Sequence, residues 1–189
     1  MTQLLKMILV SVCGLLVLSC KSDPNKISAR TNKKEAVSES QKGQAFIKDE
    51  KSTPNVLQIA LGSPDHSTLV AAVQAAGLEN ALVNAGPLMV FAPTNAAFEA
   101  LPPGTVESLL RPENKEKLAT ILKHHVTAGN YDKAFLKKFK KIGQADDTNA
   151  TVETKGDDVY VGGAKIIASI KAGNGIVHVV DKVILPNTN

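Results

Sequence analysis

The stretch Leu88–Leu101, LMVFAPTNAAFEAL, decides how this chain folds. Its first residues, Leu88–Ala92, are all apolar and lie between two prolines, which predicts a short strand that is buried on both faces. Pro93 has no backbone N–H with which to extend strand pairing. Thr94 or Asn95 can then cap a helix, because a side-chain oxygen there accepts a hydrogen bond from a free N–H at the helix start. The chain therefore turns from a sheet into a layer of helices at this corner.

This corner and two later segments resemble the signature segments of the fasciclin (FAS1) domain family. FAPTNAAFEALP follows the family's first signature, and ILKHHVTAG and NGIVHVVDKVILP agree with further segments in order and spacing. The last of these is similar to the family's closing strand. The positions that we take as structural signature residues are Phe91, Pro93, Thr94, Asn95, Phe98, His125, Asn174, Gly175, His178, Asp181 and Pro186.

The resemblance covers residues 53–186 and places a FAS1 domain at 53–187. It implies an α+β fold, with a wedge-shaped β-sandwich and a flanking layer of short helices. It also implies a non-catalytic adhesion or matrix-associated module that binds an extracellular or envelope protein or a polysaccharide and needs no cofactor. Some animal members use an Asp-Ile pair before the closing strand in receptor adhesion. This chain has Ser169-Ile170 there, so we do not expect an integrin-like interaction.

Residues 1–19 resemble a bacterial lipoprotein signal peptide. Lys6 precedes an apolar run that is too short to span a membrane as a mature helix. The ending Val17–Cys20 is similar to the lipobox, whose cysteine is acylated; an ordinary signal peptide and an uncleaved anchor are the alternatives. We expect lipidation at Cys20, because the chain after it has no cysteine, and membrane attachment through the acyl chains. Lys21 in place of aspartate favours the outer membrane of the cell envelope.

We predict that residues 20–52 form a lipidated, disordered tether, because their few apolar side chains cannot offset the entropy lost on ordering. The segment 21–51 carries eight Lys or Arg against five Asp or Glu, whereas 52–189 carries thirteen of each. The positive charge of the whole chain therefore belongs to its amino-terminal segments. The neutral domain gives no reason to expect nucleic-acid binding.

Helical patterns dominate the first part of the domain. We predict that Asp65 and Thr105 cap helices, that Gly77 ends one, and that Phe135 and Leu136 both face inward. The predicted helices are Asn55–Leu61, a helix between Asp65 and Gly77, Glu79–Val83, Val106–Leu110, Glu113–His125 and Tyr131–Phe139.

From Asn149 onward the pattern alternates, which predicts strands. They are Thr151–Thr154, Val159–Val161, Ala164–Ile170 and Ile176–Leu185, with turns at Lys155–Asp158, Gly162-Gly163 and Asn174-Gly175. The last strand carries apolar residues on both faces, so we predict that it is central in the sheet.

The histidines allow two interpretations, a metal or proton-transfer site and a role in the interior. Adjacent residues on a helix point about 100° apart, and no His or Cys follows His124 or His125 at i+4, so we predict bonded interior histidines and no metal site. His124 stands where the family usually has tyrosine and remains a possible binding residue. Asp146-Asp147 lacks the ligand spacing of a calcium loop. Hydrolase and phosphate-binding motifs are absent, so a hydrolase using His125 or His178 is only a third hypothesis.

A run of lysines gives the alternative function. Lys133, Lys137, Lys138, Lys140 and Lys141 lie within nine residues. They could bind a sulfated or phosphorylated polymer by charge, as in a periplasmic polyanion-binding protein, or they could form an ordinary solvated face.

Overall fold

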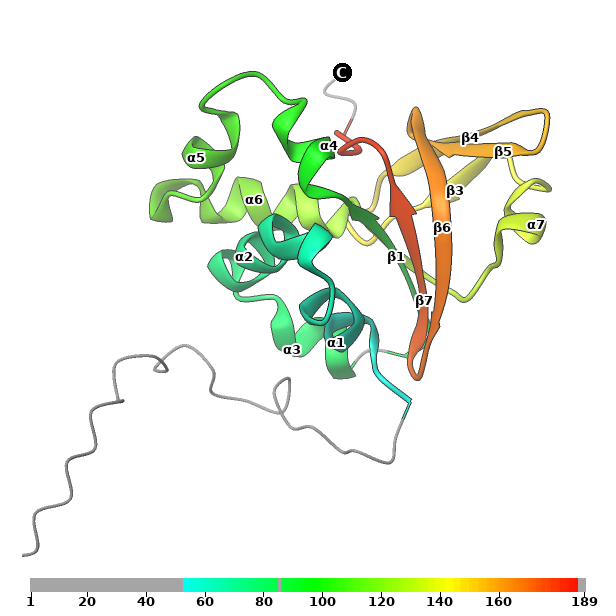
Figure 1. The fold of residues 1–189 in the computed structure, drawn as a ribbon, viewed down its shortest axis with the longest axis horizontal. Helices are drawn as coiled ribbons and strands as arrows, with labels where there is room; N and C mark the ends of the chain where they lie inside the picture. The colour runs from blue at the N-terminus through cyan, green and yellow to red at the C-terminus, as the bar shows by residue number, and fades with distance from the viewer. Residues whose placement is uncertain (1–52, 85, 187–189) are drawn as a thin grey trace, which may run out of the picture. The chain divides into compact units, whose positions relative to one another are not determined.

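A computed structural model describes residues 53–84 and 86–186 (Figure 1). The predictions for Cys20, the signal peptide and the tether concern residues outside this range. The helices are α1 (Val56–Leu61), α2 (Ser67–Ala76), α3 (Glu79–Asn84), α4 (Asn95–Glu99), α5 (Thr105–Leu109), α6 (Lys115–Lys123) and α7 (Lys133–Leu136), with 3-10 turns η2 (Pro64–His66) and η3 (Pro112–Asn114). No helix in the described part of the chain combines the length and apolar character needed to cross a membrane.

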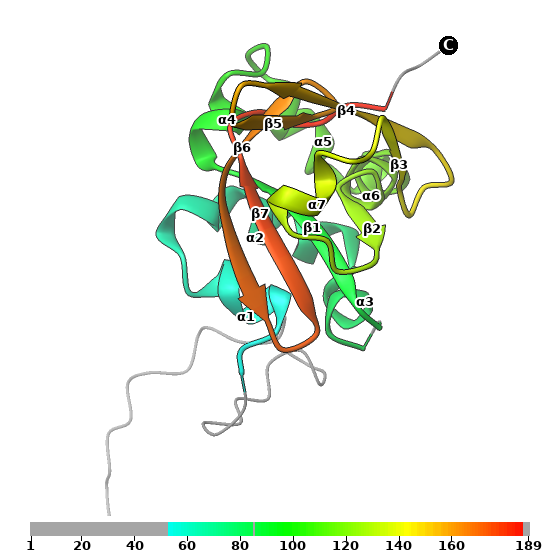
Figure 2. The same cartoon turned by 90° about the vertical axis from the view of Figure 1, so that its right-hand side faces the viewer.

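The strands form one curled sheet. They are β1 (Leu88–Pro93), β2 (Val126–Ala128), β3 (Lys141–Gly143), β4 (Asn149–Lys155), β5 (Asp158–Val161), β6 (Ala164–Ala172) and β7 (Gly175–Val180). The order in the sheet is β2-β1-β7-β6-β5-β4-β3, and β1 and β7 pair in parallel while the other neighbours are antiparallel. The helices α1 to α6 gather on one side of β1 and β7, and α7 lies on the other side (Figures 1 and 2). The α+β prediction is confirmed.

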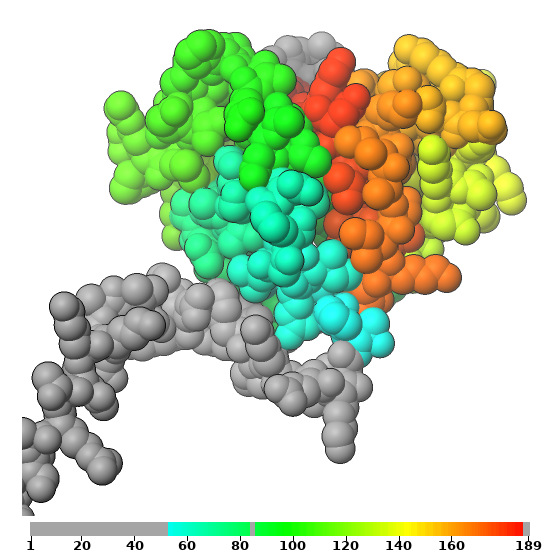
Figure 3. Space-filling model, viewed as in Figure 1, coloured from blue at the N-terminus to red at the C-terminus, as the bar shows by residue number. Residues whose placement is uncertain are grey.

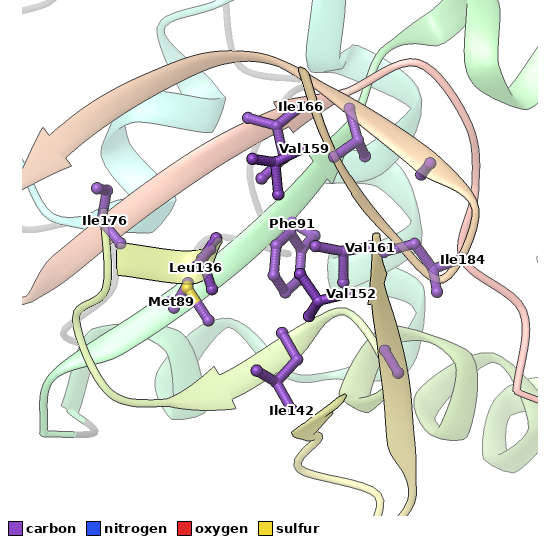
Figure 4. Close-up of a cluster of buried hydrophobic side chains, with 13 residues drawn as sticks. Met89, Phe91, Leu136, Ile142, Val152, Val159, Val161, Ile166, Ile176 and Ile184 are labelled. Atoms are coloured by element: carbon purple, nitrogen blue, oxygen red, sulfur yellow. The ribbon is translucent and has the colours of Figure 1, made fainter. Parts of the chain in front are cut away.

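Strand β1 separates two hydrophobic cores, as its predicted burial on both faces requires. Its even-numbered residues, Leu88, Val90 and Ala92, pack against the helices. Met89 and Phe91 point the other way, into a core built from β3 to β7 and α7 (Figure 4). Alternate side chains of a strand point to opposite faces, so one short apolar run joins both layers. Because both cores lie within residues 53–186, this domain has what it needs to fold alone.

The corner after β1 forms as predicted, with one difference and one addition. The strand runs one residue further than predicted, through Pro93, which lies in register with Val180 of β7. The Thr94 hydroxyl caps α4 by accepting a hydrogen bond from the N–H of Ala97 at 3.3 Å. Asn95 instead caps a different helix: its Oδ1 accepts from the N–H of Thr68 at 3.1 Å, and its Nδ2 donates to the carbonyl of Pro64 at 2.9 Å. A single amide therefore fixes the start of α2 against the start of α4.

Two predicted caps are wrong. Asp65 lies within η2, and α2 begins after it at Ser67, where Asn95 supplies the capping oxygen. Thr105 is the first residue of α5, and its N-cap is Gly104, whose φ of 80° suits a residue without Cβ. Gly77 does end α2 in the left-handed conformation, with φ 72°.

The strand predictions are correct in place and differ at the ends. Strand β7 is central but ends at Val180, because the Asp181 carboxylate turns to accept the N–H of Lys165 at 2.8 Å. The preceding turn comprises Gly173 and Asn174, since Gly175 already pairs with Ala172. Asn174 secures this turn by donating to the carbonyl of Leu82 at 2.7 Å and by accepting the N–H of Val56 at 2.9 Å. The short strands β2 and β3 were not predicted.

Candidate functional site

Helix α7 presents one side chain to the core and the next to solvent. The Asp132 carboxylate caps the helix by accepting the N–H of Phe135 at 2.7 Å. Leu136 is fully buried in the second core, whereas Phe135 is 41% exposed. The prediction that both face inward is therefore correct for Leu136 and wrong for Phe135. The helix is one turn long rather than the predicted nine residues. Neighbouring side chains on a helix point in different directions, and α7 has no second turn whose side chains could cover Phe135.

Phe135 belongs to an aromatic cluster, which we call the aromatic platform: Tyr131, Phe135 and Phe139. Phe135 is its exposed member, whereas Tyr131 and Phe139 are half-buried against the second core. The ring of Tyr131 stacks on Phe135 with centroids 5.3 Å apart and planes 18° apart. Phe139 lies 5.3 Å from Tyr131 and meets Phe135 edge-on at 5.5 Å. Rings at such separations attract each other beyond their buried area, so the exposed face of Phe135 is held in one orientation. Figure 3 shows this segment, in yellow-green, at the surface beside β6.

Five lysines surround the platform, and the structure gives them different surroundings. Lys138 places its ammonium 4.8 Å from the centroid of the Phe135 ring. Lys133 and Lys137 reach the β4–β5 hairpin, where their ammonium groups lie 3.8 Å from Asp158 and 3.5 Å from Asp157. Lys140 and Lys141 are exposed at the start of β3.

The hairpin aspartates act as counter-charges as well as turn residues. A 2.7 Å ion pair and hydrogen bond from Lys165 lowers the pKa of the Asp158 carboxyl, with Lys133 contributing in the same direction. Asp158 therefore stays ionised beside the lysines. Two of the five predicted binding lysines are thus partly neutralised, and the positive charge is concentrated at Lys138, Lys140 and Lys141.

A groove of about 450 Å³ adjoins the platform. It lies between β2 and β3, which stand at opposite ends of the sheet order, and Tyr131, Phe139 and Lys141 line it. Aromatic faces carry partial negative charge that attracts the polarised C–H groups of a sugar ring, and an ammonium group attracts a carboxylate. Taken together, the platform, the lysines and the groove suit a chain of acidic sugars.

The predicted interior role of His125 and His178 is confirmed by their hydrogen bonds. Nδ1 of His125 donates to the carbonyl of Ile121 at 2.8 Å, and Nε2 accepts from the N–H of Ile184 at 2.9 Å. Burial lowers the pKa of His125 to about 4, so the imidazole is neutral at pH 7.

His178 makes a similar pair of bonds on the other side of β1. Nε2 of His178 donates to the carbonyl of Tyr131 at 2.9 Å, and Nδ1 accepts from the hydroxyl of Ser169 at 2.8 Å. Its ring stacks on Phe91 at 5.7 Å, and burial lowers its pKa. Neither His125 nor His178 has a nitrogen left for a substrate. In the described part of the chain, no cluster of His, Cys, Asp or Glu is arranged to hold a metal ion.

His124 lies in the interior and not on the lysine surface. Its Nδ1 is 2.9 Å from the Asp146 carboxylate and 2.8 Å from the Thr148 hydroxyl, and the His124 and Asp146 side chains are both 3% exposed. Burial raises the pKa of Asp146, but its bonds to Thr148 and His124 outweigh this and lower it. No local sequence pattern predicted this pair, because Asp146 follows His124 by 22 residues.

The remaining signature residues support the fold. Gly175 lies against β1 so closely that a Cβ there would overlap the Leu88 backbone. Phe98 packs partly buried against the helix-side core, and Pro93 is fully buried at the end of β1.

Comparisons with known proteins agree with this architecture. The family model for the Fasciclin domain matches residues 64–186. Protein sll1483 of Synechocystis sp. is 48% identical over 136 residues, which are 71% of this chain and 75% of that protein. The cell surface glycolipoprotein MPB83 of Mycobacterium bovis is 33% identical over 105 residues, 55% of this chain and 46% of that protein.

A solved structure shows the same fold. It is a FAS1 domain pair from the insect cell adhesion molecule Fasciclin I, which superimposes with a TM-score of 0.63 at 18% identity. The match covers 70% of this chain and 51% of that one, so this chain spans about half of the solved pair. On the strength of the family match and the relatives, this chain belongs to the fasciclin domain family.

Proposed function

We propose that this chain is a lipid-anchored adhesion module of the cell envelope and that its FAS1 domain binds acidic polysaccharide at the aromatic platform. The role in adhesion is supported by the relatives, one of them a cell surface glycolipoprotein and another a cell adhesion molecule. Anchoring through an acylated Cys20 and an outer-membrane location are supported by the lipobox-like sequence before it. Catalysis is not part of the proposal.

The observation that carries the ligand assignment is the exposed face of Phe135. This ring is 41% exposed, yet stacking on Tyr131 fixes its orientation, and the Lys138 ammonium lies over the ring. An aromatic side chain that is ordered before binding loses little entropy when a ligand stacks on it. The lysines around it would pair with the carboxylates of the sugar units, which selects acidic polymers over neutral ones.

The second candidate is a periplasmic polyanion-binding protein that acts through lysine charge alone. The ion pairs of Lys133 and Lys137 with the hairpin aspartates reduce the charge available for it. This favours a mixed site in which stacking and charge both contribute. The two candidates respond differently to salt, because screening weakens exposed charge pairs and leaves ring stacking largely intact.

The test is calorimetric titration of the fragment 52–189 with polygalacturonate and with dextran, at low and at high salt. We expect binding to the acidic polymer that weakens with salt but persists, and no binding to dextran. Complete loss at high salt, together with equal losses from every lysine-to-glutamine change, would favour the charge-only candidate. Binding to neither polymer would refute the ligand assignment.

The anchor is tested separately in a bacterial host. The full chain should incorporate labelled palmitate and fractionate with the outer membrane, and Cys20→Ala should remove the label and release the protein. Label that remains in Cys20→Ala would contradict acylation at this residue.

A further inference from the structure

We propose that the cavity between the helices and β1 is a binding site for a medium-chain carboxylate, such as a fatty acid of about eight carbons. This cavity of about 230 Å³ lies on the helix side of β1, and α1, α2, α3 and α6 contribute to its walls. Leu88, Val126 and Ala145 also line the groove beside the platform, but no ring of the platform and none of its five lysines lines this cavity. The inference is argued from the cavity alone and does not depend on polysaccharide binding.

The lining of the cavity defines the ligand's tail. Apart from Lys123 and His125, the residues that line it are apolar. His125 offers no free nitrogen, because Ile121 and Ile184 occupy both of them. A polar ligand in this space would lose its hydrogen bonds to water without replacement. The buried part of the ligand must therefore be hydrocarbon.

The volume sets the length of that hydrocarbon. An engineered apolar cavity of about 150 Å³ stays dry and binds benzene, which corresponds to ~25 Å³ per carbon. At that ratio, a cavity of about 230 Å³ holds about nine carbons. Small residues leave this space open, since Ala60 on α1 and Ala81 on α3 stand where larger side chains would fill it. An unfilled cavity of this size lowers the free energy of unfolding, so a ligand that fills the cavity would stabilise the fold.

The charge of Lys123 indicates that the ligand's head group is an anion. It is the one charged side chain in the described lining, and it is exposed in the last turn of α6. Ala81 and Ala145 are the other exposed lining residues, so the cavity reaches solvent where these side chains lie. A carboxylate at the opening could pair with the Lys123 ammonium while its alkyl chain enters the cavity.

The experiment measures thermal unfolding and calorimetric binding of the fragment 52–189 with octanoate and with octanol as probes. Octanoate should raise the unfolding temperature and bind about tenfold more tightly than octanol. Lys123→Gln should remove that difference while octanol binding is unchanged. Equal binding of octanoate and octanol to the unmodified fragment would overturn the carboxylate assignment, and no shift with either probe would overturn the site.

Two filling variants locate the binding. Val70→Phe on α2 and Ala60→Leu on α1 each add volume to the cavity wall, and both should abolish octanoate binding. Ala71→Phe, at the adjacent exposed position of α2, is the matched control and should bind normally. The two filling variants lie on different helices. If one of them fails to fold, the other still tests whether octanoate binds in the cavity. Octanoate binding that persists in a folded filling variant would overturn the proposal.

Discussion

The backbone N–H of Ile184 donates a hydrogen bond to Nε2 of His125 over 2.9 Å. The same ring donates from Nδ1 to the carbonyl of Ile121 near the end of α6. One imidazole thus ties the segment after β7 to the helix layer. Because one nitrogen must donate and the other must accept, only the neutral ring satisfies both partners.

This requirement predicts acid sensitivity. The pKa of His125 is about 4 in the folded protein against 6.5 for the free side chain, so the unfolded chain takes up the proton first as pH falls. The contribution of His125 to the free energy of unfolding is complete above pH 6.5 and declines as pH falls toward 4, by about 3 kcal/mol in total. Burial lowers the pKa of His66 and His178 in the same direction.

Urea unfolding of the fragment 52–189 from pH 7.5 to pH 4.5 measures this decline, and imidazole NMR assigns it. The NMR signals of the His125 ring should keep the chemical shifts of a neutral imidazole from pH 7.5 down to pH 6. A ring that titrates near 6.5 would contradict the account. His125→Ala should be less stable at pH 7.5 and should show a shallower dependence on pH.

Leu136→Ala and Phe135→Ala form a matched pair on adjacent residues of α7. We expect the first to lower the free energy of unfolding by about 3 kcal/mol, since Leu136 is fully buried in the second core. The second should cost at most about 1 kcal/mol, the worth of its ring contacts. Denaturant titration separates the two, and similar losses in both variants would mean that Phe135 is a core residue.

Gly175→Ala tests the close approach of β7 to β1. A Cβ at this position would overlap the carbonyl group of Leu88, and a backbone neighbour cannot move aside as a side chain can. We expect a loss of more than about 4 kcal/mol, or no folded protein. Gly143→Ala is the control, because its Cβ would come no closer than 3.8 Å to another residue. A stable Gly175→Ala variant would contradict the parallel pairing at Leu88.

Asn95→Ala removes the capping amide that α2 and α4 share. The N–H of Thr68 and the carbonyl of Pro64 would both lose their partner, for an expected cost of about 1 to 2 kcal/mol. Asn130→Ala, an exposed loop change, should be neutral within about 0.5 kcal/mol. Equal stability of the two variants by thermal unfolding would show that the amide is not a cap.

Local signals were enough to predict the corner at β1 and α4. The apolar run, the proline and the capping threonine act on neighbours within a few residues, and each is visible in the sequence. The hairpin at Gly162-Gly163 was predicted for the same reason, and both glycines have positive φ as that turn requires. The family resemblance is the basis of the predicted domain limits, 53–187, which periodicity alone would not give.

Hydrogen-bond partners that lie far apart in the chain could not be predicted from local sequence patterns. Asn95 caps α2 by accepting the N–H of Thr68, which lies 27 residues earlier, and His124 pairs with Asp146, 22 residues later. Strands β2 and β3 have three residues each, too few to show an alternating pattern. The direction of Phe135 depends on where the one-turn α7 packs, which is set by the core and not by the local sequence.

The binding claim can be tested most directly by comparing two exposed apolar side chains. Phe135 is 41% exposed on the platform, and Ile167 is 57% exposed on β6. We expect Phe135→Ala to weaken polygalacturonate binding about tenfold, the loss of one stacked ring, and Ile167→Ala to leave it unchanged. If the two variants bind alike, with the fold of both intact, the aromatic platform is not the ligand site.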